Sequence, residues 1–300
     1  MMKYEEFEKE IMKNIEGRLS EEQSAVVKPV FKNNGLVLHG LVISNSRCNI
    51  SPTIYLDYYY ERLENGYEID ELADMVMKQY DKFALDDDFD ITVFTDFKKC
   101  KNNISYKLIN YEKNKELLKD IPHIVYLDLA IVFYCLLDEG RLETSSILIM
   151  NIHMEHWGID VNELFDIASG NTPKLLESEI KNLSEIIRGI VQAKGTEMDF
   201  PVEYEDESPM YVLTNKLKLY GACCILYKHL LEEFADSVNT DLYIIPSSVH
   251  EVLLIPKREE YDAEYLSELC KEVNATELSP EEVLSDHIYF YSRKDDAITY

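Results

Sequence analysis

Two segments near the C-terminus decide the fold: MYVLTN, residues 210–215, and DLYIIPSSVHEVLLIP, residues 241–256. Both are rich in the β-branched and aromatic residues that are typical of strands, and residues 246–249 mark a tight turn inside the second segment. The apolar stretch between them, residues 219–238, predicts a helix. The chain therefore runs strand, helix, strand, turn, strand in this region.

The last residues continue the pattern. A predicted helix at residues 262–274 and a predicted strand at 287–292 complete the order β-α-β-β-α-β, which is the split βαβ arrangement. We expect Ile244 and Leu253 to be buried in this lobe. Because helices and hairpins are mixed along the chain, the predicted class is α+β with mixed or antiparallel sheets.

Residues 1–193 predict a first α+β lobe. Lys32 to Gly35, with Asn-Gly at its end, separates two β-rich runs at 25–31 and 36–44 and indicates a hairpin. The polar segment 194–209 is the predicted linker to the C-terminal lobe, residues 210–300. The other predicted elements of the first lobe are helices at 3–17, 69–83, 114–119, 160–169 and 175–192, and strands at 53–56, 104–110, 123–137 and 146–151.

The most unusual feature of the composition is its strongly negative net charge. The chain has 57 acidic and 30 basic residues, a formal net charge of −27 and a pI near 4.6. A field of this sign repels phosphate backbones, so direct binding to nucleic acid or to anionic membranes is not expected. The acidic residues are dispersed through amphipathic segments, which favours a spread charge over a surface that mimics nucleic acid.

Cysteine usage and the N-terminus predict a reduced, cytoplasmic location. The six cysteines show neither a C-x-x-C pair nor a metal-ligand spacing, and four of them lie in apolar runs. The first residues form an acidic amphipathic segment that lacks the features of a signal peptide. The most apolar run, residues 121–137, is too short and too interrupted to span a bilayer. No cofactor is expected.

Three histidine and aspartate groups are weak candidates for a metal site. His153 and His156 are three residues apart, whereas zincins use histidines four apart, so a capped turn beside Trp157 is the better interpretation. Asp128 is a charge within a mostly apolar predicted strand, which indicates a paired carboxylate or an edge-facing position, with a metal ligand as the functional alternative. Asp86, Asp88 and Asp90 have the alternate spacing of a calcium loop, but Ile91 and Phe97 stand where that loop needs Gly and Glu.

The densest group of polar side chains for binding is Ser247, Ser248, His250 and Glu251. Strand alternation directs His250 and Glu251 to opposite faces, so they do not form a base with its orienting partner. Ser247 lacks the G-x-S-x-G turn of a nucleophile elbow. Turn chemistry and a binding role both remain open for this group. Asn215 closes a strand shortly before an apolar helix, where free N–H groups could bind an anion.

Several segments resemble a known family. ISYKLINYEKNKELLKDIPH, LDLAIVFY, the Trp157-Gly158-Ile159 turn, and MYVLTN through SSVHEVLLIP are similar to a family of uncharacterised bacterial proteins, a domain of unknown function found in anaerobic Gram-positive bacteria. The likeness extends from about residue 4 to residue 291. The resemblance implies an intact single-chain protein of unknown role and carries no catalytic residues.

The sequence favours a non-enzymatic binding or regulatory protein with an unknown protein or small-molecule partner. The alternative is a metal-dependent hydrolase or nuclease-like enzyme that uses Asp128, His153 and His156, with His250 as a further group. Catalytic groups can converge from distant positions, which keeps this alternative open. An acidic mimic of nucleic acid is the third possibility.

Overall fold

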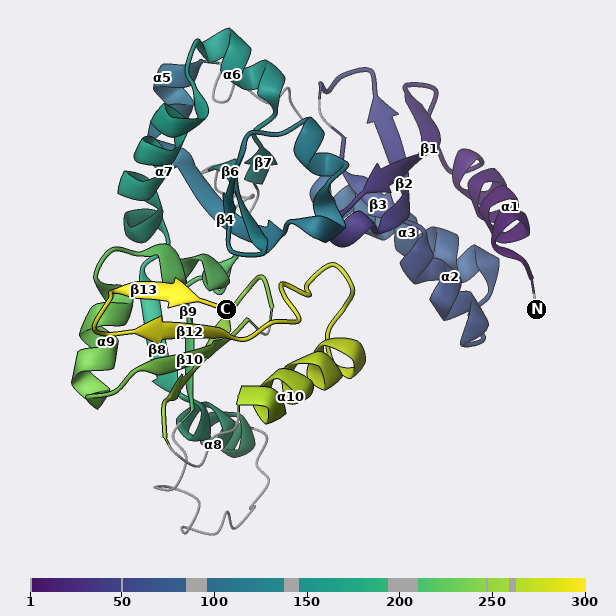
Figure 1. Ribbon diagram of the computed structural model, residues 1–300. Coiled ribbons are helices and arrows are strands. Elements are labelled where there is room, and N and C mark those ends of the chain that lie inside the picture. Colours follow the sequence, from purple (N-terminus) through teal and green to yellow (C-terminus); the bar gives the residue numbers. More distant parts are fainter. Residues whose placement is uncertain are drawn as a thin grey trace. The chain divides into compact units, whose positions relative to one another are not determined.

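Backbone contacts divide the chain into two units, Met1–Val93 and Phe94–Tyr300. This boundary differs from the predicted linker at 194–209, because strands on either side of that segment pair in one sheet. The predicted α+β class is confirmed, since helices accompany antiparallel sheets throughout (Figure 1). The computed structural model describes residues 2–49, 51–84, 96–137, 146–193, 210–246, 248–258 and 263–300.

The first unit is an antiparallel sheet, in the order β1-β2-β3, whose inner face packs on helices. Phe7, Ile11 and Ile15 recur at helical spacing and are fully buried, as their pattern predicts. Asn34 has a φ of 60°, so the predicted hairpin turn is confirmed. The elements are α1 (Tyr4–Glu16), β1 (Gln23–Phe31), η1 (Asn33–Gly35), β2 (Val37–Asn45), β3 (Thr53–Tyr55), α2 (Asp57–Glu64) and α3 (Ile69–Phe83).

The second unit begins with a small antiparallel sheet centred on β6. The prediction of one strand over 123–137 is wrong, because Tyr126 pairs with Leu129 across a tight turn. Leu127 adopts a left-handed φ of 56° there, which places Asp128 in the turn rather than inside a strand. The elements are α5 (Phe97–Cys100), η2 (Lys101–Asn103), β4 (Ile104–Asn110), η3 (Glu112–Asn114), η4 (Leu117–Lys119), β5 (His123–Tyr126), β6 (Leu129–Leu136) and β7 (Ser146–Leu148).

Two helices and a strand connect this sheet to the larger one. After α6 (Asn151–Trp157), the predicted cap Asp160 accepts hydrogen bonds from two backbone N–H groups and opens α7 (Val161–Leu175). The prediction of a helix over 175–192 is wrong in its first part. Residues of β8 (Ser178–Asn182) pair with the next strand instead, and α8 (Leu183–Ala193) follows. Pairing with a neighbouring strand overrides the local helical pattern here.

The larger sheet has the order β13-β12-β10-β11-β9-β8, with antiparallel neighbours. The predicted β-α-β-β-α-β order is confirmed, and β11 lies between β9 and β10 as a split βαβ unit requires. The predicted helix at 219–238 is interrupted at His229, whose φ is 65°. The elements are β9 (Tyr211–Asn215), η6 (Gly221–Leu226), α9 (Leu230–Val238), β10 (Leu242–Ile245), β11 (Val252–Pro256), α10 (Ala263–Thr276), β12 (Tyr289–Ser292) and β13 (Ala297–Thr299).

Both faces of the larger sheet are covered, which explains its nearly continuous apolar strands. Ile244 and Leu254 face a core that also contains α7, η6, α9 and the smaller sheet. Ile245 and Ile255 face α10 on the other side. Ile244 is fully buried as predicted, whereas Leu253 is only partly buried. None of the helices in the described ranges is long and apolar enough to cross a membrane.

Candidate functional site

The loop that follows β9 is built around the side chain of Asn215. Its amide donates to the carbonyl oxygen of Leu219 at 2.7 Å, and its carbonyl accepts from the backbone N–H groups of Leu217 at 3.1 Å and Leu219 at 3.2 Å. Asn215 is fully buried. The residue therefore fixes the path of the loop and is not itself open to a ligand.

Two residues of the same loop have a left-handed backbone conformation, and a glycine in it is closely surrounded by other atoms. Lys218 and Tyr220 both have a φ of 53°, at a cost of roughly 1–2 kcal/mol each for residues with a side chain. A Cβ on Gly221 would lie 2.4 Å from the carbonyl oxygen of His250. Strain held by surrounding contacts is characteristic of binding and catalytic sites.

His250 faces this loop from the turn between β10 and β11. Its Nδ1 accepts a hydrogen bond from the Tyr220 N–H at 3.3 Å, and the two rings are stacked with 5.7 Å between their centres. The neutral imidazole consequently carries its proton on Nε2, which is a donor. Ser248 supports the turn, because its hydroxyl accepts from the His250 N–H at 3.0 Å.

Lys107 brings a cation to the same place from the middle of β4. Its Nζ lies 4.0 Å from the centre of the Tyr220 ring and 6.0 Å from the centre of the Tyr134 ring. Within the described ranges Lys107 forms no ion pair. Among the described residues, the ammonium of Lys107 therefore contacts aromatic rings and no carboxylate.

Two buried hydroxyls lie on the same face of the small sheet as Lys107. Ser105 and Tyr134 are cross-strand partners, and Ser105 precedes Lys107 by two positions, so strand alternation directs all three side chains to one face. Ser105 Oγ and the Tyr134 hydroxyl are buried and have no hydrogen-bond partner among the described residues. Burial raises the pKa of Tyr134, so this hydroxyl stays protonated as a donor.

Asp128 belongs to a different cluster, at the turn between β5 and β6. It accepts hydrogen bonds from the Ser285 hydroxyl at 2.6 Å and from the Tyr289 hydroxyl at 2.7 Å. Burial, followed by the charge of Asp128, raises the pKa of Tyr289. The Ser285 hydroxyl also accepts from the His287 N–H at 2.9 Å, so it is already paired within the fold. Asp128 is therefore a paired carboxylate, one of the interpretations that its sequence context allows.

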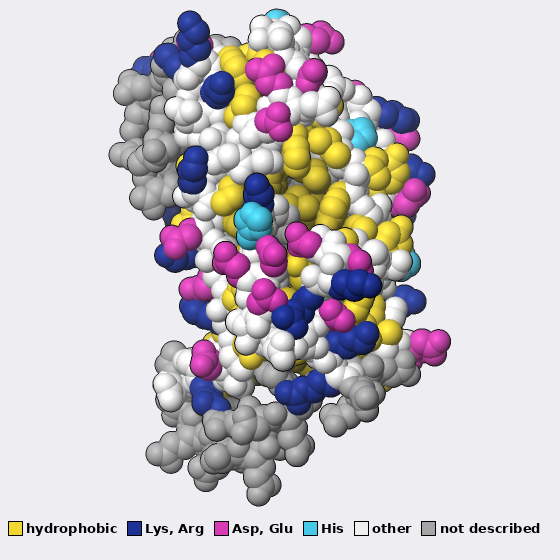
Figure 2. Space-filling view, turned by 60° about the vertical axis from the view of Figure 1, so that its left-hand side comes forward, with side chains coloured by type: hydrophobic (Ala, Val, Ile, Leu, Met, Phe, Trp, Pro, Cys, Tyr) yellow, Lys and Arg dark blue, Asp and Glu magenta, His cyan; other side chains and the backbone are white. Residues whose placement is uncertain are grey.

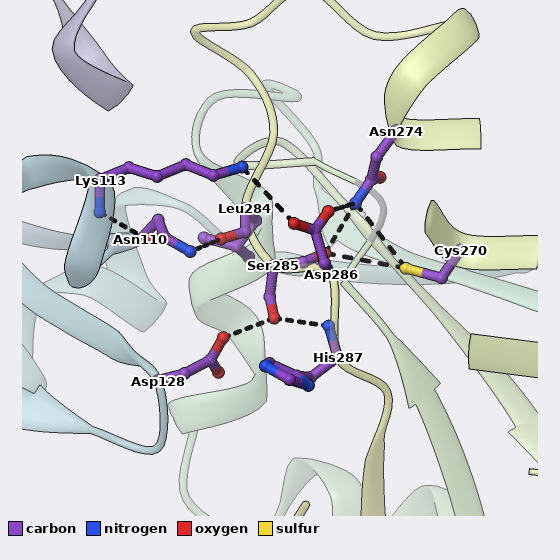
Figure 3. Close-up of polar contacts among 9 residues, drawn as sticks. All are labelled: Asn110, Lys113, Asp128, Cys270, Asn274, Leu284, Ser285, Asp286 and His287. Carbon is purple, nitrogen blue, oxygen red and sulfur yellow. Dashed lines mark hydrogen bonds and ion pairs between the residues drawn. The ribbon is translucent and has the colours of Figure 1, made fainter. Parts of the chain in front are cut away.

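Further hydrogen bonds fasten the segment before β12 to its surroundings (Figure 3). Asn110 donates to the carbonyl oxygen of Leu284 at 3.0 Å, and Asn274 donates to Asp286 at 2.9 Å and to the Ser285 carbonyl oxygen at 2.8 Å. These contacts join β4 and α10, which are far apart in the sequence, through one short segment. The cluster therefore stabilises the packing of β4 and α10 against this segment.

His153 and His156 lie on α6 and differ in their surroundings. His153 Nδ1 accepts from the Met150 N–H at 2.9 Å, and its ring stacks on Trp157 with 5.9 Å between centres. His156 is exposed. Burial, and then the proximity of His156, lowers the pKa of His153. His153 therefore caps the start of the helix, in agreement with the capped turn that the sequence favours.

The lowered pKa of His153 predicts a pH effect on stability. The unfolded chain binds the proton more readily, so the contribution of His153 is present above the unfolded pKa, about 6.5, and is lost as pH falls through it. We expect the midpoint of thermal unfolding to fall less for His153→Asn than for the unsubstituted chain between about pH 7.5 and about pH 5.5. The exposed His156→Asn serves as the matched control. Equal pH dependence in the chain and in His153→Asn would contradict this interpretation.

Some of the remaining sequence candidates lie together, and the others are outside the described residues. Asn215, Ser248, His250 and Glu251 all lie at the β9 end, where the Glu251 carbonyl oxygen accepts from the Ser248 N–H at 3.2 Å. Ser247, and Asp86, Asp88 and Asp90, lie outside the described residues. Among the residues that the structure describes, no three His, Cys, Asp or Glu side chains are grouped to hold a metal ion.

The sequence analysis missed Lys107, Tyr134 and Tyr220. A lysine in a strand is usually solvated, and only the apolar flanks in ISYKLIN distinguish Lys107. Tyr220 precedes a buried Gly221 directly, which is a local indication of close packing. The register that places Tyr134 beside Ser105 is a long-range property of the sheet and has no local pattern.

Comparison with known proteins gives one match. No curated protein and no solved structure matches the chain. A model of a family of unknown function, DUF5688, matches residues 4–293. This confirms the resemblance to an uncharacterised domain that the sequence segments carry. The chain therefore belongs to the DUF5688 family.

Proposed function

We propose that the protein is a non-enzymatic binding protein for a small organic anion, held between Lys107 and His250. The observation that carries the proposal is the ammonium of Lys107, which packs 4.0 Å from the Tyr220 ring and forms no ion pair in the described part of the chain. A carboxylate placed there would neutralise this charge and accept a further hydrogen bond from His250 Nε2.

The rigidity of the loop supports binding. Asn215 makes three hydrogen bonds within the loop, and the Thr214 hydroxyl donates to the His250 carbonyl oxygen at 2.8 Å. Together they hold the backbone of the loop and of His250 in a fixed relation before any ligand arrives. Preorganisation of this kind increases affinity, because less conformational entropy is lost on binding.

The charge distribution bears on the choice between a binding protein and a nucleic-acid mimic. Figure 2 shows that, on the face in view, carboxylates alternate with lysine, arginine and hydrophobic side chains. A mimic requires carboxylates concentrated at phosphate-like spacing. The mixed face supports the binding proposal.

The proposal includes a cytoplasmic location. Five buried cysteines, at positions 100, 135, 223, 224 and 270, form no disulfide bond among the described residues. Free thiols persist most readily in a reducing compartment.

Propionate is a suitable probe, because it offers a single carboxylate. With one charge-assisted contact and one hydrogen bond, we expect a Kd on the order of 1 mM. At roughly one hundred times Kd the ligand stabilises the folded state by about 2.7 kcal/mol. The midpoint of thermal unfolding should then rise by roughly 5–10 °C. Sodium chloride at the same ionic strength is the reference, since salt alone screens the repulsion among the carboxylates.

Lys107→Met keeps the apolar part of the side chain and removes the charge. In this variant propionate should raise the midpoint of thermal unfolding no more than sodium chloride does. Lys119→Met removes the same charge from an exposed lysine that pairs with Glu116, and should retain the full difference. A propionate effect of equal size in both variants, or none in the unsubstituted chain, would reject the proposed function.

A further inference from the structure

We infer that the anion is a short hydroxy acid, whose hydroxyl group binds at Tyr134 and Ser105 while its carboxylate binds at Lys107. This inference rests on the proposed function and specifies its ligand. It comes from the two buried hydroxyls that lie beside the ammonium without a partner in the described part of the chain.

An unpaired buried hydroxyl is unfavourable. Leaving such a group without a partner forfeits its hydrogen bonds to water, and buried polar groups in folded proteins are paired in the great majority of cases. Tyr134 is 1% exposed and Ser105 is fully buried. Two unpaired hydroxyls at one pair of cross-strand positions thus indicate a site that is completed by something outside the chain.

The geometry sets the length of the ligand. Lys107 Nζ lies 6.0 Å from the centre of the Tyr134 ring. A ligand that bonds to both the ammonium and the phenol must therefore be short, with its carboxylate and its hydroxyl on the same or on adjacent carbon atoms. A two- to four-carbon hydroxy acid has the required reach.

Tyr220 is the side chain that must move to admit the ligand. Its ring packs edge-on against Tyr134, with 5.2 Å between centres, and lies under the Lys107 ammonium. A ligand that touches both groups displaces this ring from between them. The ring can leave this position by rotation about its side-chain torsions, while the backbone stays in the path that Asn215 fixes.

The test compares lactate and 3-hydroxypropionate with propionate, which has the same charge and chain length but no hydroxyl. Calorimetric titration of the full chain should give a Kd about tenfold lower for at least one hydroxy acid, the factor that one added hydrogen bond provides. In Tyr134→Phe the ratio should fall to about one, with propionate binding unchanged. The free Tyr134→Phe variant should also unfold at a higher temperature than the unsubstituted chain, because it no longer buries an unpaired hydroxyl.

The outcomes separate the two proposals. If the hydroxy acids and propionate bind equally well and Lys107→Met abolishes both, the hydroxyl assignment is overturned while the anion site stands. If none of the three acids binds, both proposals fail. If the preference for a hydroxy acid persists in Tyr134→Phe and in Ser105→Ala, the hydroxyl is recognised elsewhere and the inference is wrong.

Discussion

Gly221→Ala is expected to destabilise the second unit by more than about 3 kcal/mol, at the upper end of the range for overpacked sites. The added Cβ would lie 2.2 Å from Thr214 Oγ1, 2.4 Å from the His250 carbonyl oxygen and 2.9 Å from the Asn215 N. Two of these atoms belong to the backbone, so no side-chain rotation relieves the contact. Urea unfolding followed by circular dichroism measures the loss.

Gly170→Ala is the matched control for this substitution. Gly170 lies within α7, and a Cβ there meets no other atom within 4 Å. Alanine should stabilise the helix by about 0.5–1 kcal/mol, because glycine has the lower helix propensity. A free energy of unfolding that is unchanged in Gly221→Ala would show that the loop and the turn do not approach as closely as described.

Asp128→Ala is expected to lower the free energy of unfolding by roughly 2–5 kcal/mol. The substitution removes the acceptor of two hydroxyls, and each buried donor left unpaired costs about 1–3 kcal/mol. Both donors, Ser285 and Tyr289, are fully buried. Chemical denaturation at neutral pH gives the value directly.

A double-mutant cycle with Tyr289→Phe tests whether the loss comes from this contact. Asp128→Ala and Tyr289→Phe remove the same 2.7 Å hydrogen bond from either side, so the double variant should be less destabilised than the sum of the two. A coupling energy near zero would contradict the assignment of Asp128 as a structural carboxylate and would reopen its role as a metal ligand.

Local sequence patterns predict the elements that depend on neighbouring residues. The helix at 69–83 agrees with its predicted ends, and the Asn34-Gly35 turn forms as its residue types require. Errors occur where long-range contacts override local preference. Residues 178–182 form a strand because β9 offers a partner. The chain turns at Leu127, where a left-handed φ is unusual for leucine, although the flanking residues read as one apolar run.

The sequence predicts only some of the residues of the candidate site. Ser248 and His250 are close in sequence, and the end of β9 brings Asn215 to the same place. Lys107 and Tyr134 come from another sheet, and their position depends on the β4–β6 register. Asn215 and Ser248, proposed as binding groups, use their side chains to hold the backbone, so the groups left for a ligand are those of Lys107, His250 and Tyr134.

The most direct test of the anion site is a crystal structure of the protein grown with lactate. The account predicts the carboxylate within hydrogen-bond distance of Lys107 Nζ and of His250 Nε2, and the Tyr220 ring turned away from its contact with Tyr134. A structure in which Lys107 still packs on Tyr220 with no anion bound, under conditions where lactate is in large excess over the expected Kd, would contradict it.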